Sequence, residues 1–152
     1  MSRASRALLD TSVVIDPPHN LGEFTDTAAI STVTLAELAF GLHTTDPVQS
    51  AAREARYQQI VSIFDPIPYS VTSARLYGAL CAAVRDAGRD PRPRRFTLLI
   101  ASVAADAGIP LLTRNPDDFS GIHPAVRVIA VPDPSSRCRP TPAEAATLRI
   151  RV

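Results

Sequence analysis

The sequence predicts an α/β protein, namely a three-layer α/β/α domain built on a central parallel sheet of four to five strands. Short apolar runs alternate with longer segments of helical periodicity over residues 1–131. These runs are mostly apolar, as expected for strands buried on both faces by helices. The chain has 152 residues, 45% hydrophobic and 20% charged, which is typical of one globular domain.

In the first half of the chain, two apolar runs are predicted strands and three segments are predicted helical. The strands are residues 6–9 and 28–31, and the helical segments are residues 13–15, 34–42 and 47–64. Pro17 and Pro18 end the first helical segment. Asp46 followed by Pro47 is a typical helix start, with the aspartate as the N-cap and proline at the first helical position.

The second half continues the alternation and ends in a tail. We predict helices over residues 71–87 and 96–107, a loop over 89–94, and strands over 109–113 and 126–131. Ser70 is an N-cap, and Gly88 and Gly108 are the expected helix stops. Residues 132–152 contain several prolines and are expected to form a partly flexible tail, within which residues 148–152 alternate like an edge strand.

Acidic residues follow three of the predicted strands. Asp10 ends the first strand, Glu37 lies on the helix after the second, and Asp117 and Asp118 follow the strand over 109–113. Ligands of parallel α/β sheets bind outside the carboxyl ends of the strands. Carboxylates gathered there repel one another unless a cation lies among them, and oxygen ligands favour Mg²⁺ or Mn²⁺. Such ions activate water for attack on phosphoryl groups.

Each acid also has a local alternative. Asp10 can cap the turn after its strand, and Asp118 can cap the turn around Phe119. Thr34 and Glu37 have the spacing of a capping box, in which the glutamate bonds back to the amide of the N-cap residue. These alternatives stay open on local sequence alone.

Four segments together resemble the PIN domains, in particular the VapC toxins of bacterial toxin–antitoxin pairs. The segments are residues 8–16, 30–41, 98–108 and 112–119, and they occur in the same order with similar spacing. The resemblance implies an α/β/α fold and a nuclease that hydrolyses RNA, of the tRNA or rRNA class, with a divalent metal and activated water. It also implies a homodimer and a VapB-type antitoxin as partner.

The resemblance assigns roles to residues by position. Asp10, Glu37 and Asp118 correspond to the first, second and fourth catalytic acids, with the metal held chiefly by Asp10 and Asp118 and with Glu37 acting on the water. Auxiliary positions beside these acids are Thr11, Ser12, Thr97, Thr113, Asn115 and Asp117.

One position departs from the family pattern. The third acid of the family stands directly before the Leu-Leu-Ile-Ala run, where this chain has Thr97. Asp106 lies too far along the same helix to replace it. Asp90 lies on the preceding loop, and Asp117 is the nearer spare carboxylate. The sequence is therefore compatible with an active ribonuclease of reduced metal affinity and with a degenerate domain that binds RNA or antitoxin without cleaving it.

Arginines form the candidate RNA-binding surface. Five of them lie between Arg85 and Arg95, next to the helix that carries Thr97. The RNA-binding candidates are Arg89, Arg92, Arg94, Arg95 and Arg114. The alternatives for this cluster are a solvated loop and a surface that docks an acidic antitoxin segment.

The remaining features are not specific. The net charge of +1 gives no global attraction to nucleic acid. No apolar run approaches the roughly 20 residues of a membrane span. The two cysteines have neither disulfide nor metal-site spacing, so we expect a cytoplasmic protein with reduced thiols. A plain α/β module with another ligand remains a third reading, in which the three acids do not converge.

Overall fold

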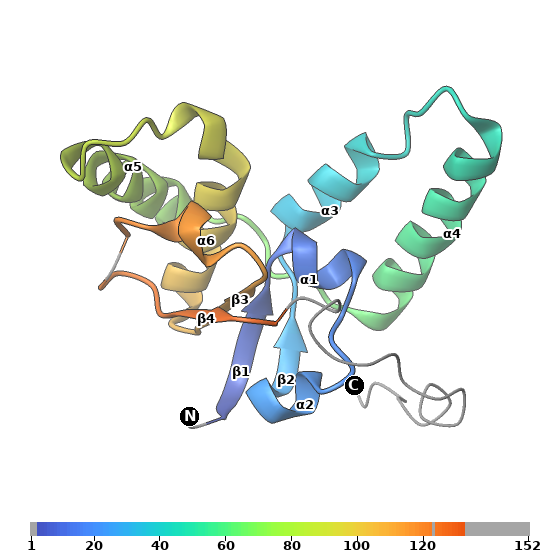
Figure 1. The fold of residues 1–152 in the computed structure, drawn as a ribbon, viewed down its shortest axis with the longest axis horizontal. Helices are drawn as coiled ribbons and strands as arrows, with labels where there is room; N and C mark the ends of the chain where they lie inside the picture. Colours follow the sequence, from blue (N-terminus) through green and yellow to red (C-terminus); the bar gives the residue numbers. More distant parts are fainter. Residues whose placement is uncertain (1–2, 123, 133–152) are drawn as a thin grey trace.

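The computed structural model describes residues 3–122 and 124–132, and these residues form a parallel sheet with helices around it (Figure 1). The sheet has four strands in the order β2-β1-β3-β4, and every neighbouring pair is parallel. The strands are β1 (Ala4–Leu9), β2 (Thr25–Ala29), β3 (Leu111–Thr113) and β4 (Val128–Ala130). The predicted fold class is confirmed.

Two apolar cores lie on opposite faces of this sheet, because neighbouring residues of a strand point to opposite sides. Leu8 packs into a core with α5 (Val71–Asp86) and α6 (Arg95–Ala107). Its neighbours Ala7 and Leu9 pack into a second core with α1 (Thr11–Ile15), α2 (Leu21–Phe24) and part of α4 (Pro47–Ile63). The result is the expected three layers.

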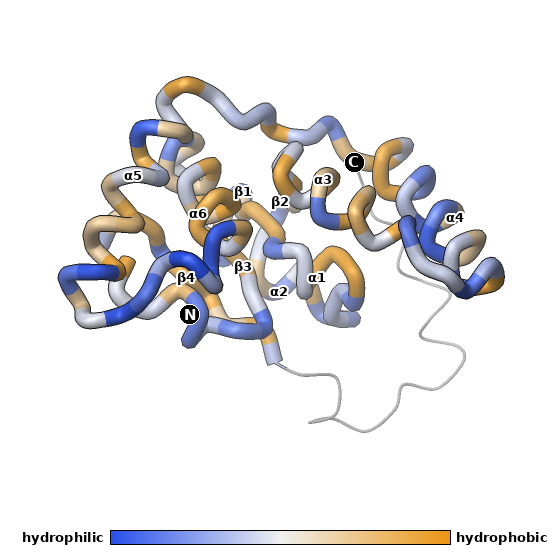
Figure 2. Tube along the Cα trace, turned by 90° about the horizontal axis from the view of Figure 1, so that it is seen from above, coloured by the Kyte–Doolittle hydropathy of each residue, from blue (hydrophilic) through white to orange (hydrophobic). Residues whose placement is uncertain are grey.

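The helix α6 is the most deeply buried helix of the described chain. Six of its residues are buried, and its hydropathy is high along most of its length (Figure 2). Gly108 ends it with a left-handed backbone, φ 65°, which glycine adopts without steric cost. The predicted stop at Gly108 is confirmed, and so is the predicted N-cap of α4, where Asp46 accepts hydrogen bonds from the amides of Val48 and Gln49.

The helix α3 (Thr32–Phe40) lies beyond the carboxyl ends of β1 and β2, between α6 and α4 (Figure 1). Ser31 begins it, because the Ser31 hydroxyl accepts a hydrogen bond from the amide of Thr34 at 3.1 Å. This position brings residues of α3 over the edge of the sheet where the predicted acids lie.

Several boundaries differ from the prediction. The second strand covers Thr25–Ala29 instead of residues 28–31, since β1 supplies its hydrogen bonds and polar threonines are compatible with an edge strand. The short helix α2 was not predicted. The expected loop over 89–94 contains a 3-10 helix, η1 (Arg92–Arg94), and a second one, η2 (Pro116–Phe119), follows β3. Pro93 lies at the second position of η1 and Pro116 at the first position of η2, where proline is tolerated because the amides of the first turn have no partner within the helix.

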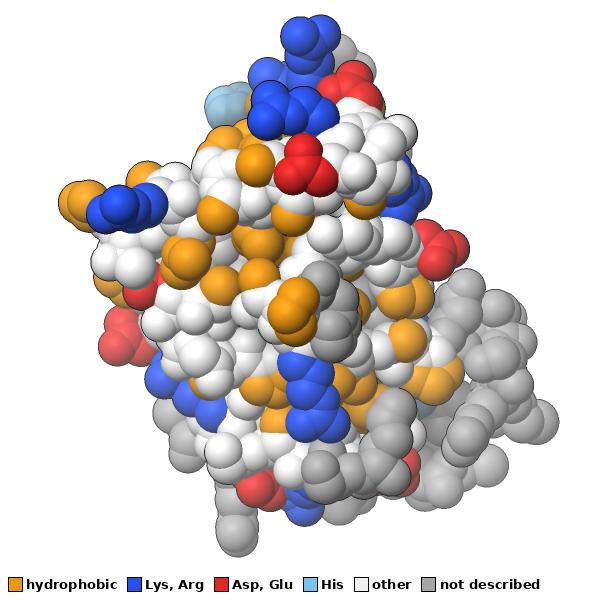
Figure 3. Space-filling model, turned by 90° about the vertical axis from the view of Figure 1, so that its left-hand side faces the viewer, with side chains coloured by type: hydrophobic (Ala, Val, Ile, Leu, Met, Phe, Trp, Pro, Cys, Tyr) orange, Lys and Arg blue, Asp and Glu red, His pale blue; other side chains and the backbone are white. Residues whose placement is uncertain are grey.

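Apolar side chains lie across the middle of the face on the left of Figure 1, with charged side chains around them and one basic side chain among them (Figure 3). None of the helices in residues 3–122 and 124–132 is long and apolar enough to cross a membrane. The predicted tail strand over residues 148–152 lies outside the described residues.

Candidate metal and phosphodiester site

Asp10 lies at the carboxyl end of β1, between the neighbouring strands β2 and β3. Its amide donates to the carbonyl of Leu112 at 2.9 Å, so the sheet itself fixes its backbone. Asp10 occupies the N-cap position of α1, but its carboxylate makes no capping hydrogen bond. The alternative of a simple turn cap is therefore wrong, and the carboxylate is available for another role.

Two hydroxyls hold the Asp10 carboxylate by one oxygen. Ser12 and Thr113 each donate a hydrogen bond to Asp10 Oδ2 at 2.8 Å. Each hydroxyl oxygen in turn accepts a backbone N–H, from Arg114 at 3.3 Å and from Asn115 at 3.0 Å. The amides occupy the hydroxyl lone pairs and leave the hydroxyl hydrogens for Asp10. Asp10 Oδ1 has no described hydrogen bond and remains open.

Glu37 lies in the interior of α3 and points toward α1. The Thr11 hydroxyl donates a short hydrogen bond to Glu37 Oε2. The capping-box alternative is wrong, because Ser31 caps the helix and Thr34 is a buried residue of the first turn, whose hydroxyl lies 3.1 Å from that of Ser31. Glu37 is thus a full turn too late to bond back to the N-cap amide.

Asp10 lies close enough to Glu37 to affect the ionisation of the Glu37 carboxyl group. Burial raises the pKa of Glu37 above its ordinary value of 4.5, the hydrogen bond from Thr11 lowers it, and the negative charge of Asp10 raises it further. Two carboxylates from separate elements therefore lie near each other, because Glu37 accepts a hydrogen bond from Thr11, the residue that follows Asp10. A cation between them would relieve this repulsion.

Asp118 belongs to η2 and has a different neighbour. Its Oδ1 lies 3.9 Å from Nε of Arg94, whose side chain is only 21% exposed. Among residues 3–122 and 124–132, no three or more His, Cys, Asp and Glu side chains gather as a metal-binding group. The three predicted acids therefore do not form one cluster among the described residues. Asp10 and Glu37 lie near each other, and Asp118 pairs with Arg94 instead.

The structure also places the spare acids. Thr97 is half-buried on the first turn of α6, and no side-chain hydrogen bond is described for it. Asp106 accepts hydrogen bonds from Ser70 and from Ser73, the latter at 2.8 Å, at the other end of α6. Asp90 accepts the amide of Arg92 within its own loop, at 3.0 Å. Asp117 is exposed. Asp106 and Asp90 therefore have structural partners of their own, and Asp106 does not replace the missing acid.

The chain matches the PIN domain family over residues 7–122. The match begins within β1, includes β2 and β3, and contains every acid discussed above. The chain belongs to the PIN domain family. It is 32% identical over 125 residues to Ribonuclease VapC5 of Mycobacterium tuberculosis, covering 80% of this chain and 90% of that protein. This relative places the PIN domain described here among the VapC proteins.

Solved structures similar to this PIN domain are toxin–antitoxin complexes. VapBC-5 from Mycobacterium tuberculosis superposes with a TM-score of 0.72 at 30% identity, covering 84% of this chain and 99% of the other. A toxin–antitoxin complex from Klebsiella pneumoniae has a TM-score of 0.58 at 26% identity, covering 82% and 96%. VapBC from Salmonella typhimurium, bound to DNA, shares the fold at 24% identity, with a TM-score of 0.67 over 84% and 98%.

The donor set of this PIN domain fits a hard divalent cation. Asp10 Oδ1 and the second oxygen of Glu37 have no described hydrogen bond, and every nearby side-chain donor is an oxygen. Mg²⁺ is held in proteins through one or two carboxylates while it keeps several waters. Asp10 and Glu37 supply two such carboxylates, whereas Asp118 pairs with Arg94.

The candidate RNA-binding arginines fall into different environments. Arg92 and Arg95 are exposed, and Arg89 donates to the carbonyl of Asp117 at 3.1 Å. Arg94 is mostly buried, and its Nη1 is buried without a hydrogen-bond partner among the described residues. A buried guanidinium nitrogen without an acceptor is costly, so Arg94 is the member of the set best suited to receive an anionic oxygen.

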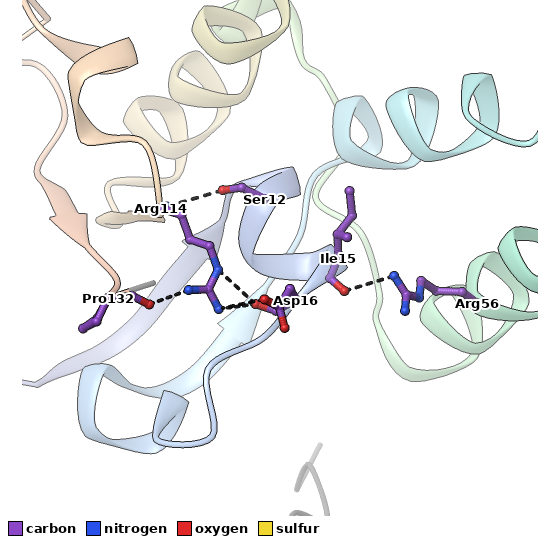
Figure 4. A network of polar contacts seen from close by, with 6 residues as sticks. All are labelled: Ser12, Ile15, Asp16, Arg56, Arg114 and Pro132. Atoms are coloured by element: carbon purple, nitrogen blue, oxygen red, sulfur yellow. Dashed lines mark hydrogen bonds and ion pairs between the residues drawn. The ribbon is translucent and has the colours of Figure 1, made fainter. Parts of the chain in front are cut away.

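Arg114 does not belong to this surface, which corrects the prediction. Its side chain is 12% exposed and pairs with Asp16 at 3.6 Å. Its guanidinium also donates to the carbonyls of Asp16 and Pro132 (Figure 4). All three nitrogens therefore bind this chain's own atoms. The local sequence gave no sign of these partners, because Asp16 lies 98 residues away.

Proposed function

We propose that this protein is the endoribonuclease toxin of a toxin–antitoxin pair, and that it hydrolyses RNA phosphodiesters with Mg²⁺ or Mn²⁺ held chiefly by Asp10, while Glu37 acts on the attacking water. Asp118 is the further ligand. The observation that carries the proposal is that two neighbouring carboxylates, Asp10 and Glu37, are each held by a hydroxyl of α1 after the carboxyl end of β1. The similarity to Ribonuclease VapC5 supports the reaction class.

The residues of the site have separate tasks in this mechanism. When bound, the cation supplies Lewis-acid activation of water and neutralises charge on the phosphoryl group. Asp10 offers Oδ1 as a ligand, because Ser12 and Thr113 saturate its other oxygen. Glu37 accepts a proton from the attacking water, whose oxygen bonds to phosphorus while the bond to the leaving oxygen breaks and that oxygen takes a proton from solvent.

The raised pKa of Glu37 is suited to this task. A general base works best when its pKa lies near the pH of operation, and burial raises the pKa of Glu37 in that direction. The hydrogen bond from Thr11 keeps the carboxylate in one orientation. Glu37 is therefore the base, and Asp10 the principal ligand.

The proposed substrate is RNA of the tRNA or rRNA class, as implied by the resemblance to VapC toxins. Phosphate contacts by arginine supply most of the affinity for nucleic acids. Arg89, Arg92, Arg94 and Arg95 lie on the segment before α6 and at its start, and Arg94 joins that segment to Asp118. Arg94 thus brings this segment next to one of the proposed acids, Asp118.

The partner is a VapB-type antitoxin, because solved structures similar to this chain are of VapBC complexes. We also propose a homodimer in the cytoplasm. The apolar side chains on the face shown in Figure 3 are compatible with a contact between copies. Sedimentation of the purified chain measures the oligomeric state directly.

Cleavage of total RNA tests the proposed function. We expect cleavage that needs Mg²⁺ or Mn²⁺, stops in excess chelator, and is lost in Asp10→Asn. The matched control is Asp26→Asn, which removes an exposed aspartate whose carboxylate pairs with Arg3 before the start of β1. Cleavage that continues in chelator, or that survives in Asp10→Asn, contradicts the proposal.

A second candidate function is binding of RNA or antitoxin without cleavage. Thr97 favours it, because a hydroxyl stands where the family has an acid and no third carboxylate joins Asp10 and Glu37 among the described residues. It predicts an RNA complex without hydrolysis in the natural chain, and cleavage in Thr97→Asp. Cleavage by the natural chain excludes it.

A further inference from the structure

The first two residues of helix α1 each donate a side-chain hydrogen bond to one carboxylate of the site. Thr11 donates to Glu37, and Ser12 donates to Asp10. This helix has only five residues, Thr11–Ile15. A helix of this length is unstable by itself, so its orientation depends on contacts with the rest of the protein.

The last carbonyls of a helix have no partner within the helix and need donors from elsewhere. In α1 these donors are two arginine side chains. Arg114 donates from Nε to the carbonyl of Asp16 at 3.1 Å and also from Nη2, while Arg56 of α4 donates to the carbonyl of Ile15 at 3.1 Å (Figure 4). Basic side chains at this end also interact favourably with the helix dipole.

Arg114 touches α1 at both of its ends. Its guanidinium binds the C-terminal end and pairs with the Asp16 carboxylate at 3.6 Å, while its backbone amide donates to Ser12 Oγ at 3.3 Å. Its remaining nitrogen donates to the carbonyl of Pro132, just after β4. The flat guanidinium fork thus connects α1, the end of β3 and the end of β4.

The position of Arg114 in the chain explains its relation to Asp10. The preceding residue, Thr113, donates directly to Asp10 Oδ2, and the amide of Asn115 orients the Thr113 hydroxyl. Arg114 itself fixes the helix that supplies the second donor, Ser12. Three consecutive residues at the end of β3 and just after it therefore determine the direction of one carboxylate.

We propose that Arg114 is a positioning residue for the metal site, which acts by clamping the C-terminal end of α1 so that Ser12 and Thr11 hold Asp10 and Glu37 in place. The inference rests on the proposed metal site. It assigns to Arg114 a role inside the protein and none toward RNA phosphates. Residues that orient a metal ligand contribute about 10- to 100-fold to metal affinity in known sites.

Binding of Mn²⁺ alone to the full chain, measured by titration calorimetry, tests this role. We expect Arg114→Gln to weaken Mn²⁺ binding by about tenfold or more. The control is Arg3→Gln, which also removes one positive charge and one ion pair with an aspartate, Asp26, but before β1 begins. Arg3→Gln is expected to bind Mn²⁺ like the natural chain.

A double-mutant cycle separates positioning from general stabilisation. If Arg114 acts through α1, the double variant Ser12→Ala/Arg114→Gln loses much less Mn²⁺ affinity than the sum of the losses of the two single variants, expressed as logarithms of affinity. Additive effects overturn the inference. If Arg114→Gln does not fold, Arg56→Gln removes a single bond at the same helix end, and we expect a smaller loss of a few-fold; unchanged affinity there also overturns it.

The outcomes distinguish this inference from the proposed function. The proposed metal site, and the inference with it, is contradicted if the natural chain binds no Mn²⁺. It is also contradicted if the natural chain and Asp10→Asn bind Mn²⁺ with equal affinity. Mn²⁺ binding that depends on Asp10 but is the same in Arg114→Gln and Arg3→Gln leaves the proposed function intact and overturns the role of Arg114.

Discussion

Thr11 on α1 donates a hydrogen bond to Oε2 of Glu37 on α3, a residue 26 positions further along the chain. The residue before Thr11 is Asp10, whose charge raises the pKa of the same glutamate. Adjacent residues of one short segment thus affect the Glu37 carboxylate in opposite directions. The ionisation of Glu37 depends on how accurately α1 is placed.

Replacing Thr11 by valine should shift the pH dependence of the site. The hydrogen bond from Thr11 lowers the pKa of Glu37, so Thr11→Val leaves burial and Asp10 unopposed and the pKa rises further. Because the proposed base must be deprotonated, the acid limb of the cleavage profile should move to higher pH. The profile of the cleavage rate against pH measures this. Thr27→Val, at an exposed position of β2, should leave the limb in place.

Replacing Glu37 by glutamine should stabilise the protein near neutral pH. The folded-state pKa of Glu37 is raised, so its contribution to stability is complete below about 4.5 and is lost as the pH rises through the folded value. Glutamine keeps an acceptor for Thr11 without the charge. We expect its unfolding temperature at pH 7 to exceed that of the natural chain by about 2–4 °C.

Excess Mg²⁺ should narrow that difference, since a cation that binds only the folded state stabilises the natural chain. Glu54→Gln, on the exposed surface of α4, is the control and should not change the unfolding temperature with or without Mg²⁺. Equal unfolding temperatures of Glu37→Gln and the natural chain across the pH range would show that Glu37 is not destabilised by its surroundings.

Replacing Thr97 by aspartate should strengthen metal binding. The new carboxylate stands at the family's third acidic position, on the first turn of α6, where a negative charge also favours the helix. We expect Mn²⁺ affinity to rise about tenfold, equivalent to about 1.4 kcal/mol. Phe96→Asp adds the same charge to the same turn at a half-exposed residue. If both variants gain equally, the effect is general electrostatics and not a new ligand.

Replacing Arg92 and Arg95 by glutamine should weaken RNA binding without changing the metal site. Both side chains are exposed, so we expect them to contribute to RNA affinity through phosphate contacts, which salt screens. In the non-cleaving Asp10→Asn background, the logarithmic salt slope of RNA affinity should fall by about 1 for each arginine that contacts a phosphate. Arg6→Gln, at an exposed residue of β1, should keep the slope. An unchanged slope in the double variant removes these two from the RNA surface.

Local patterns in the sequence were sufficient to predict the layers of the fold and the position of Asp10. Continuous apolar runs indicated buried parallel strands, and the end of such a run located Asp10 at the carboxyl edge of the sheet. Asp46 with Pro47, and Gly108, marked a helix start and a helix stop that the structure confirms. These features depend on backbone geometry within a few residues, which the sequence displays directly.

Only the tertiary structure decided the roles of Glu37 and Arg114. Spacing alone made Glu37 resemble part of a capping box and made Arg114 resemble a surface cation, but Ser31 caps α3 and Arg114 binds the end of α1. The deciding contacts join residues 26 and 98 positions apart. A periodic pattern reports which face of an element is buried and carries no record of which distant atom a polar side chain meets. The acids were therefore readable from the sequence, whereas the hydroxyls and the arginine clamp that orient them became visible only when the chain was folded.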